Sequence, residues 1–416
     1  MTELFEKRPA TGGDYEPLGA AKLLDHGDRG VRLKAGSTTV EVSALAPNLF
    51  RVGAFPEGRT PRYDSEAIAK SEWEPVEVSM SESEAEITLS TPEATAHIAL
   101  DPLRIRFTDE TGREFAADDP ELGMGFVAGR KQSVVTTPLG DPARLYKKRA
   151  VGERYFGCGE RTSGLEKTGS YQVFWNVDPP AGHTAAFDNL YTSVPFTLSM
   201  AAGKAHGLFF DNTHRVEFDL AKEDAGRAYY GAEGGDIIYY AFSGPTPRAV
   251  LDRYTELTGR TPMPPMWSLG NQQCRWSYET EDEVRELAKQ FRERDIPCDV
   301  IFLDIDYMDG YRVFTWDRDR FPDPAKLISD LREQGFRVVT IVDPGVKTDE
   351  DYPVYVEGRA RDLYCKTQEG EEFHNVVWPG MCAFPDFTNP ATREWWGENH
   401  TALTETGVAG IWNDMN

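Results

Sequence analysis

The sequence has little positive charge compared with its negative charge. It contains 45 Lys and Arg residues against 69 Asp and Glu residues, which gives a formal net charge of −24 at pH 7. Proteins that bind nucleic acid or an anionic membrane surface present a basic face to the phosphates. The composition therefore argues against nucleic acid or a membrane as a partner, and it is compatible with a neutral ligand.

Paired cysteines and long apolar segments are also lacking. The five cysteines form no CxxC pair, so we expect neither a disulfide framework nor a zinc site. The first residues contain no apolar stretch like that of a signal peptide, and no run approaches the length of a membrane span. The histidines show no metal-ligand spacing. We therefore expect a cytoplasmic protein without a metal or other cofactor.

A chain of 416 residues is too long for one compact core, so two or more domains are expected. Up to about residue 245 the sequence reads as short strands separated by Gly, Pro, Asp and Asn, without convincing helices. Many short strands in a row are typical of a β-sandwich. We predict an antiparallel β-sandwich domain over residues 1–245. Its clearest strands are Thr39–Leu45, Leu49–Phe55, Ala85–Leu89, Leu103–Phe107, Val194–Met200, Gly207–Phe210, Val216–Leu220 and Asp236–Phe242.

After this region strands and helices alternate. Thr280 and Glu283 form a capping-box pattern that opens one helix, and Asp323 followed by Pro324 opens another. The alternation indicates a parallel barrel or a doubly wound sheet. Polar residues at the ends of the strands favour a barrel. We predict that residues 246–416 are the first four β/α units of a (β/α)8 TIM barrel, cut short. The expected strands are Trp267–Gly270, Val300–Leu303, Val338–Val342 and Val408–Trp412.

Asp414 directly follows the last of these strands. Hydrolysis of a glycosidic bond with retention requires two carboxyl groups about 5–5.5 Å apart, one of them a nucleophile. A carboxylate at the end of a barrel strand is well placed for that role. From position alone, a capping or loop aspartate is an equally good interpretation of Asp414.

Several short motifs follow one another along the chain, and the last of them is Trp412–Asn416 (WNDMN). This motif is similar to the nucleophile signature of glycoside hydrolase family 31, the family of α-glucosidases and α-xylosidases, and other segments resemble the family in the same order along the chain. The resemblance runs from about Val151 to the last residue. The other segments are Phe156–Glu160, Trp175–Pro180, Leu269–Tyr278, Asp304–Met308, Ile341–Pro344, Val377–Gly380 and Phe384–Phe387.

By this resemblance Asp414 is the nucleophile and Asp304 binds sugar hydroxyls, although Asp304 could instead be a buried partner of Arg275. Asp178 resembles a loop acid of the N-terminal domain that reaches the sugar in the +1 subsite; the alternative is a turn residue. Asp343 is expected to brace the pocket rather than to touch substrate. The resemblance places six further residues in the wall of the sugar pocket, each with a core role as the alternative: Trp276, Ile305, Ile341, Trp378, Trp412 and Met415.

The family's general acid is an aspartate after the sixth barrel strand, beyond Asn416. We therefore expect the complete protein to cleave terminal α-glucosidic bonds, and this chain alone to be inactive. The alternatives are an α-xylosidase or another family 31 specificity, or a non-catalytic carbohydrate-binding fragment. Ile305 followed by Asp306 resembles the α-glucosidase form of the motif, whereas Asn271 and Ser277 depart from the family pattern. Self-association of the complete protein is compatible with the sequence.

Overall fold

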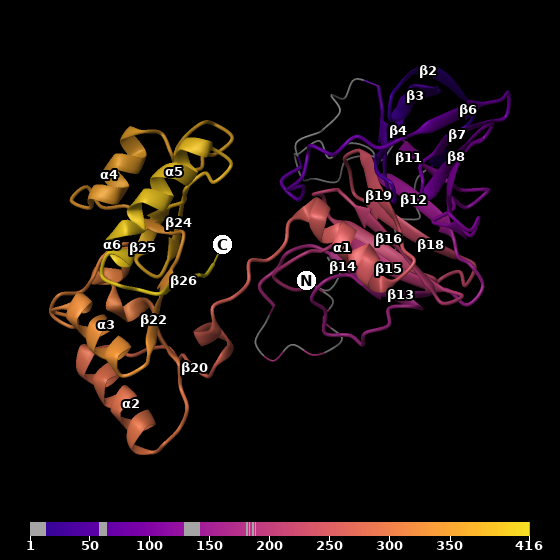
Figure 1. Ribbon diagram of the computed structural model, residues 1–416. Helices are drawn as coiled ribbons and strands as arrows, with labels where there is room; N and C mark the ends of the chain where they lie inside the picture. Colours follow the sequence, from indigo (N-terminus) through magenta and orange to yellow (C-terminus); the bar gives the residue numbers. More distant parts are fainter. Residues whose placement is uncertain are drawn as a thin grey trace. The chain divides into compact units, whose positions relative to one another are not determined.

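The structure, a computed structural model, describes residues 14–57, 65–128, 142–179, 182, 184, 187 and 189–415. The chain divides into two compact units, Met1–Thr261 and Pro262–Asn416. Figure 1 shows strands throughout the first unit, whereas strands and helices are mixed in the second.

The described residues of the first unit form three antiparallel sheets. The six-stranded sheet has the order β1 (Asp14–Pro17), β11 (Met124–Ala128), β12 (Ala143–Lys148), β18 (Arg227–Ala232), β17 (Val216–Leu220), β14 (Ser170–Phe174). The eight-stranded sheet has the order β13 (Arg154–Gly157), β15 (Phe196–Ala201), β16 (Lys204–Phe210), β19 (Ile237–Ser243), β5 (Leu49–Phe55), β4 (Thr38–Ala46), β3 (Gly30–Ala35), β2 (Ala21–Gly27). The five-stranded sheet has the order β10 (Glu114–Phe115), β9 (Leu103–Asp109), β8 (Ala94–Leu100), β7 (Glu86–Ser90), β6 (Ser79–Glu82).

Alternating burial along the strands builds the core between these sheets. In β4, Val40, Val42 and Ala44 are fully buried while the residues between them are partly exposed. Apolar side chains from all three sheets join in one cluster, to which β9 contributes Phe107 and β17 contributes Phe218. Facing sheets that share one apolar core form a sandwich, so the predicted β-sandwich is confirmed.

The helix α1 (Pro247–Thr258) covers the other face of the eight-stranded sheet. Thr246 caps it by accepting a hydrogen bond from the backbone N–H of Ala249. Its buried face packs on β15, β16 and β19, and the ring of Tyr254 stacks on that of Phe196 with centroids 4.0 Å apart. The helix α1 therefore lies in the first compact unit, which ends at Thr261; a domain boundary between residues 245 and 246 stays a prediction.

Four parallel strands form the main sheet of the second unit, in the order β20 (Gln272–Gln273), β21 (Val300–Leu303), β22 (Arg337–Val342), β26 (Gly410–Asn413). A small antiparallel sheet has the order β23 (Val346–Lys347), β25 (Gly380–Ala383), β24 (His374–Val377). The helices are α2 (Glu281–Glu293), α3 (Pro324–Glu333), α4 (Pro353–Ala360), α5 (Pro390–Asn399) and α6 (Thr401–Thr404).

The helix caps of this unit match the sequence patterns. The hydroxyl of Thr280 accepts a hydrogen bond from Glu283 N at 3.3 Å, and the carboxylate of Asp323 accepts one from Lys326 N at 3.0 Å. Buried side chains of α2 and α3 join those of β21 and β22 in one apolar cluster, and Figure 1 shows these helices beside the strands. Parallel strands with outer helices are the arrangement of a (β/α)8 barrel, so the predicted half-barrel is confirmed. No helix in the described part of the chain is long and apolar enough to cross a membrane.

The prediction of a first barrel strand at Trp267–Gly270 is wrong. Met266–Leu269 form a 3₁₀ helix, and the strand comes later, at Gln272–Gln273. Both the backbone N–H and the hydroxyl of Ser268 donate to the carbonyl of Pro265. These local hydrogen bonds form a turn directly after Pro264 and Pro265. The strand therefore begins later in the sequence than expected.

Candidate active site

Three carboxyl groups stand at the carboxyl ends of neighbouring strands: Asp304 after β21, Asp343 after β22 and Asp414 after β26. The strand register pairs Phe302 with Val339 and Ile341 with Trp412. Paired residues of adjacent strands point to the same face, and side chains alternate between faces along each strand. The three aspartates, each an even number of residues beyond these pairs, therefore share one face of the sheet.

Asp304 is buried, with 9% of its surface exposed. Its Oδ1 accepts a hydrogen bond from the backbone N–H of Ile305 at 2.8 Å. Burial raises the pKa of Asp304, and the negative charges of Asp414 and Asp306 add to this, while the bond from Ile305 opposes it. The described contacts of Arg275 are a hydrogen bond to Ser277 O and a position over the Tyr278 ring. They give no support to the alternative that Asp304 serves as its partner.

Asp343 is the most buried of the three carboxyl groups, with 4% of its surface exposed. Its Oδ1 is buried and has no hydrogen-bond partner. Burial raises the pKa of Asp343 to about 7, and the charges of Asp414 and Asp304 contribute in the same direction. Sequence reasoning gave this residue only a bracing role. The available signal was its position, because Asp343 follows a barrel strand as Asp304 and Asp414 do.

Asp414 is partly exposed, and its backbone N–H donates to the carbonyl of Val342 with an N···O distance of 3.3 Å. This bond ties the residue after β26 to the end of β22. The carboxyl group that the family resemblance makes the nucleophile is therefore close to Asp343 and accessible to solvent.

Exposed aromatic rings belong to the same unit. Trp276 and Trp378 expose 70% and 47% of their surface, and their ring centroids lie 5.3 Å apart. Met415 is also exposed, at 57%. Neighbouring exposed aromatic rings form an apolar surface patch, which can mark a binding site, and flat rings suit the apolar faces of sugars. A role of these residues in the sugar pocket stays a prediction.

The other predicted wall residues are more buried. Ile305 and Ile341 are part of the apolar core of the second unit, and Trp412 packs edge-on against Phe302, with ring centroids 6.1 Å apart. Asp178 is exposed in the segment after β14 of the first unit. The structure thus brings together the carboxyl groups and places two exposed indoles side by side, while the roles of Ile305, Ile341, Trp412 and Asp178 stay predictions.

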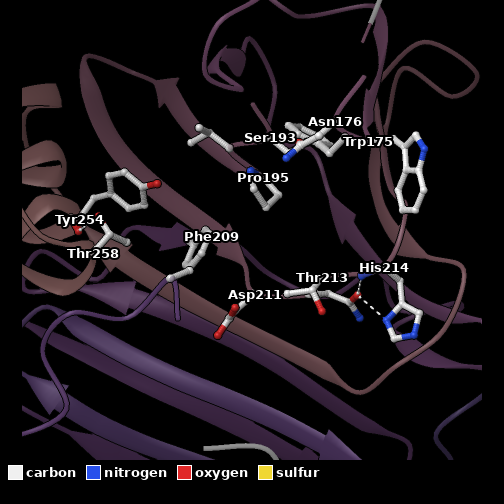
Figure 2. Close-up of a pocket in the computed structure, with 14 residues that line it drawn as sticks. Trp175, Asn176, Ser193, Pro195, Phe209, Asp211, Thr213, His214, Tyr254 and Thr258 are labelled. Carbon is white, nitrogen blue, oxygen red and sulfur yellow. Dashed lines mark hydrogen bonds between the residues drawn. The ribbon is translucent and has the colours of Figure 1, made fainter. Parts of the chain in front are cut away.

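A separate cavity of about 440 Å³ lies within the first unit. Figure 2 shows Tyr254 and Thr258 of α1 on one side of it and His214 on the other. Trp175, which precedes Asp178 in the same segment, is also part of its lining. None of the predicted site residues is among the described residues that line this cavity. Among the described residues, no three or more His, Cys, Asp or Glu side chains are grouped so that they could hold a metal ion.

The two halves of the chain match two models of one family. Residues 261–416 match the Glycosyl hydrolases family 31 TIM-barrel domain, and residues 39–219 match the Glycosyl hydrolase 31 N-terminal galactose mutarotase-like domain. The chain belongs to glycoside hydrolase family 31. The resemblance inferred from the sequence motifs is confirmed.

Curated relatives and a solved structure match between two thirds and nearly all of the chain. This chain is 44% identical over 400 residues to alpha-glucosidase 2 of Bacillus thermoamyloliquefaciens, and the match covers 96% of this chain and 49% of that protein. An alpha-glucosidase of Saccharolobus solfataricus is 36% identical over 277 residues, covering 67% of this chain and 40% of the relative. A GH31 dextranase of Flavobacterium johnsoniae, solved as a mutant complexed with isomaltotriose, has a TM-score of 0.84 at 28% identity, covering 96% of this chain and 48% of the dextranase. The chain thus spans about half the length of the alpha-glucosidase 2 and dextranase chains.

Proposed function

We propose that the full-length protein is a retaining glycoside hydrolase that cleaves terminal α-glucosidic bonds, with Asp414 as its nucleophile. The observation that carries this proposal is the cluster of Asp304, Asp343 and Asp414 on one face of a parallel sheet, at the carboxyl ends of the strands. That end of a barrel is where catalytic residues of this fold stand.

The chemistry follows from the positions of two carboxyl groups. The carboxylate of Asp414 attacks the anomeric carbon, the bond to the leaving oxygen breaks, and a glycosyl ester forms. Water then hydrolyses the ester with overall retention. The carboxyl group of Asp304 accepts hydrogen bonds from sugar hydroxyls, since charged acceptors make the stronger bonds. In the family a later aspartate acts as general acid, and that role is assigned to no residue of this chain.

The choice of sugar rests on the motif and on the relatives. Ile305 and Asp306 follow the first carboxyl group, and Asp306 accepts a hydrogen bond from Tyr311 OH at 3.1 Å and pairs with Arg320 at 3.5 Å. These contacts hold Asp306 on the side of the loop that carries Tyr311. Both curated relatives compared above are alpha-glucosidases by name. We infer that the substrate is a neutral α-glucoside, in keeping with the net charge of −24. We also infer a cytoplasmic location and no stable association with nucleic acid or membranes.

Replacement of the nucleophile tests this proposal. In the full-length protein, Asp414→Ala should lower the turnover of p-nitrophenyl α-glucoside by about 10⁴-fold or more. Azide should restore activity and give a glycosyl azide of inverted configuration, because the small anion takes the place of the carboxylate. The matched control is Asp309→Ala, which removes a carboxylate with 64% of its side chain exposed and should leave turnover nearly unchanged. Full activity of Asp414→Ala would refute the assignment.

A further inference from the structure

The charged surroundings of Asp343 are unusual. Burial raises its pKa, and the charges of Asp414 and Asp304 add to this. Burial likewise raises the pKa of Tyr307 and of Cys382, with a smaller contribution from Asp343. These groups come from β26, from the ends of β21 and its following turn, and from β25. These groups are acids, a phenol and a thiol, and the cation Lys347 acts on one of them by lowering the pKa of Cys382.

Burial penalises the charged forms of Asp343 and Asp304, and the charges of Asp414 and Asp304 oppose the ionisation of Asp343. In such a cluster the protons come off in coupled steps, and the last proton stays on the group whose charged form is least favoured. Asp304 receives a backbone hydrogen bond from Ile305, which favours its charged form. Asp343 is more buried and has an oxygen without a partner.

We propose that Asp343 is a positioning residue for the nucleophile: a buried carboxylic acid that stays protonated in mildly acidic solution, so that it meets the Asp414 carboxyl group as an O–H donor and not as a third negative charge. This inference rests on the proposed function, because it assigns Asp343 a task in the same site. A protonated Asp343 offers an O–H donor beside two carboxylates. An ionised Asp343 would instead place a third negative charge beside Asp304 and Asp414.

The first test reads the proton directly and needs no turnover. The chain is labelled with ¹³C at the aspartate carboxyl carbons and titrated by NMR, and the Asp343 signal is assigned by its loss in Asp343→Asn. Its midpoint should lie near 7, and it should fall by about one pH unit or more in Asp414→Asn, because one neighbouring charge is removed. Asp309→Asn, at an exposed acid, should leave it unchanged. A midpoint near about 4, or one insensitive to Asp414→Asn, would overturn the proposal.

The second test uses the full-length protein with p-nitrophenyl α-glucoside. An amide keeps the shape and the donor of a neutral carboxylic acid, so Asp343→Asn should retain kcat/KM at pH 6 within about fivefold, whereas Asp343→Ala should lose about a hundredfold through kcat. A purely structural carboxylate would not be rescued by the amide. A loss in Asp343→Asn as large as that in Asp343→Ala would show that the charge of Asp343 is needed, and would also overturn the proposal. If Asp414→Ala were fully active, the proposed function would fail, while the NMR titration would still decide the protonation of Asp343.

Discussion

The backbone N–H of Asp414 lies 3.3 Å from the carbonyl oxygen of Val342 and donates a hydrogen bond to it. This bond continues the parallel ladder of β22 and β26 by one step beyond the last strand residues. It brings Asp414 level with Asp343 at the end of β22. The buried carboxyl group of Asp343 and the accessible one of Asp414 therefore stand at the same level at the ends of two neighbouring strands.

The exposed indole pair gives a prediction about substrate binding. Removing the ring of Trp378 takes away one of two aromatic faces 5.3 Å apart. Trp378→Ala in the full-length protein should lower kcat/KM for α-glucosides by about tenfold, since an aromatic contact contributes about 0.5–1.5 kcal/mol beyond its area. Val376→Ala, on the same hairpin and also exposed, is the matched control and should change little. Equal kinetics of the two variants would place the sugar elsewhere.

The Ile305–Asp306 motif predicts which sugar is preferred. Asp306 is engaged with Tyr311 and Arg320, and neither it nor Ile305 is a bulky aromatic residue that would fill the space for a C6 hydroxymethyl group. A fitting hydroxymethyl group contributes about 1–3 kcal/mol to discrimination in the transition state. The full-length protein should therefore prefer the α-glucoside to the matched α-xyloside by about tenfold or more in kcat/KM. Equal or reversed ratios would favour an α-xylosidase.

A buried ion pair in the sandwich predicts a large stability effect. Lys147 Nζ lies 2.7 Å from Asp118 Oδ1, with side-chain exposures of 4% and 0%, and also donates to Tyr239 OH. Lys147→Met leaves Asp118 buried and uncompensated, which should lower the free energy of unfolding by about 3–5 kcal/mol. Lys148→Met breaks only an exposed pair with Glu114 and should cost under about 1 kcal/mol.

Urea denaturation measures both variants of the sandwich. The double variant Lys147→Met with Asp118→Asn should recover part of the loss, because the amide of the new residue needs no counter-charge. The ion-pair argument fails if the two lysine variants are equally stable.

The pKa of Asp343 predicts how stability changes with pH. Its folded value is about 7, above the value of about 4 expected for an unfolded aspartate. The folded state therefore holds more protons between these values. The stabilisation from protonated Asp343 is complete below about pH 4 and is lost as the pH rises through about 7. Asp343→Asn lacks this loss, so its stability relative to wild type should rise from pH 4 to pH 8 by up to about 3–4 kcal/mol.

Calorimetric unfolding of wild type and Asp343→Asn across this pH range measures the difference. Taking the difference removes the contribution of Asp304, whose pKa is also raised. A difference independent of pH would mean that Asp343 ionises in the folded state as readily as in the unfolded chain.

The sequence predicts best those elements that depend on a local sequence pattern. Val300–Leu303 is an unbroken apolar run that becomes β21 without a change of bounds, and the caps at Thr280 and Asp323 form as their motifs require. The two-residue strand β20 has no such pattern, and the turn bonds at Ser268 displaced it from its expected place.

Features that depend on distant partners could not be read from the chain. The sequence predicts a helix for α1, but only its packing on β15, β16 and β19, with the stack of Tyr254 on Phe196, shows that it belongs with the sandwich. The sequence around Asp343 likewise does not indicate whether this carboxyl group is protonated. The missing hydrogen-bond partner and the two nearby charges arise when β22 lies beside β21 and β26.

The order of the strands along the chain gives the site an order of assembly during synthesis. Asp304 and Asp343 follow β21 and β22, whereas Asp414 follows β26, after the whole β23–β25 sheet and α5 have been made. Chains emerge from the ribosome with the N-terminal end first, and folding can begin before synthesis is finished. Asp414 is thus the last of the three carboxyl groups to be synthesised. A nascent chain halted before Asp414 would contain Asp304 and Asp343 without the third carboxyl group, whose charge contributes to the raised pKa of both.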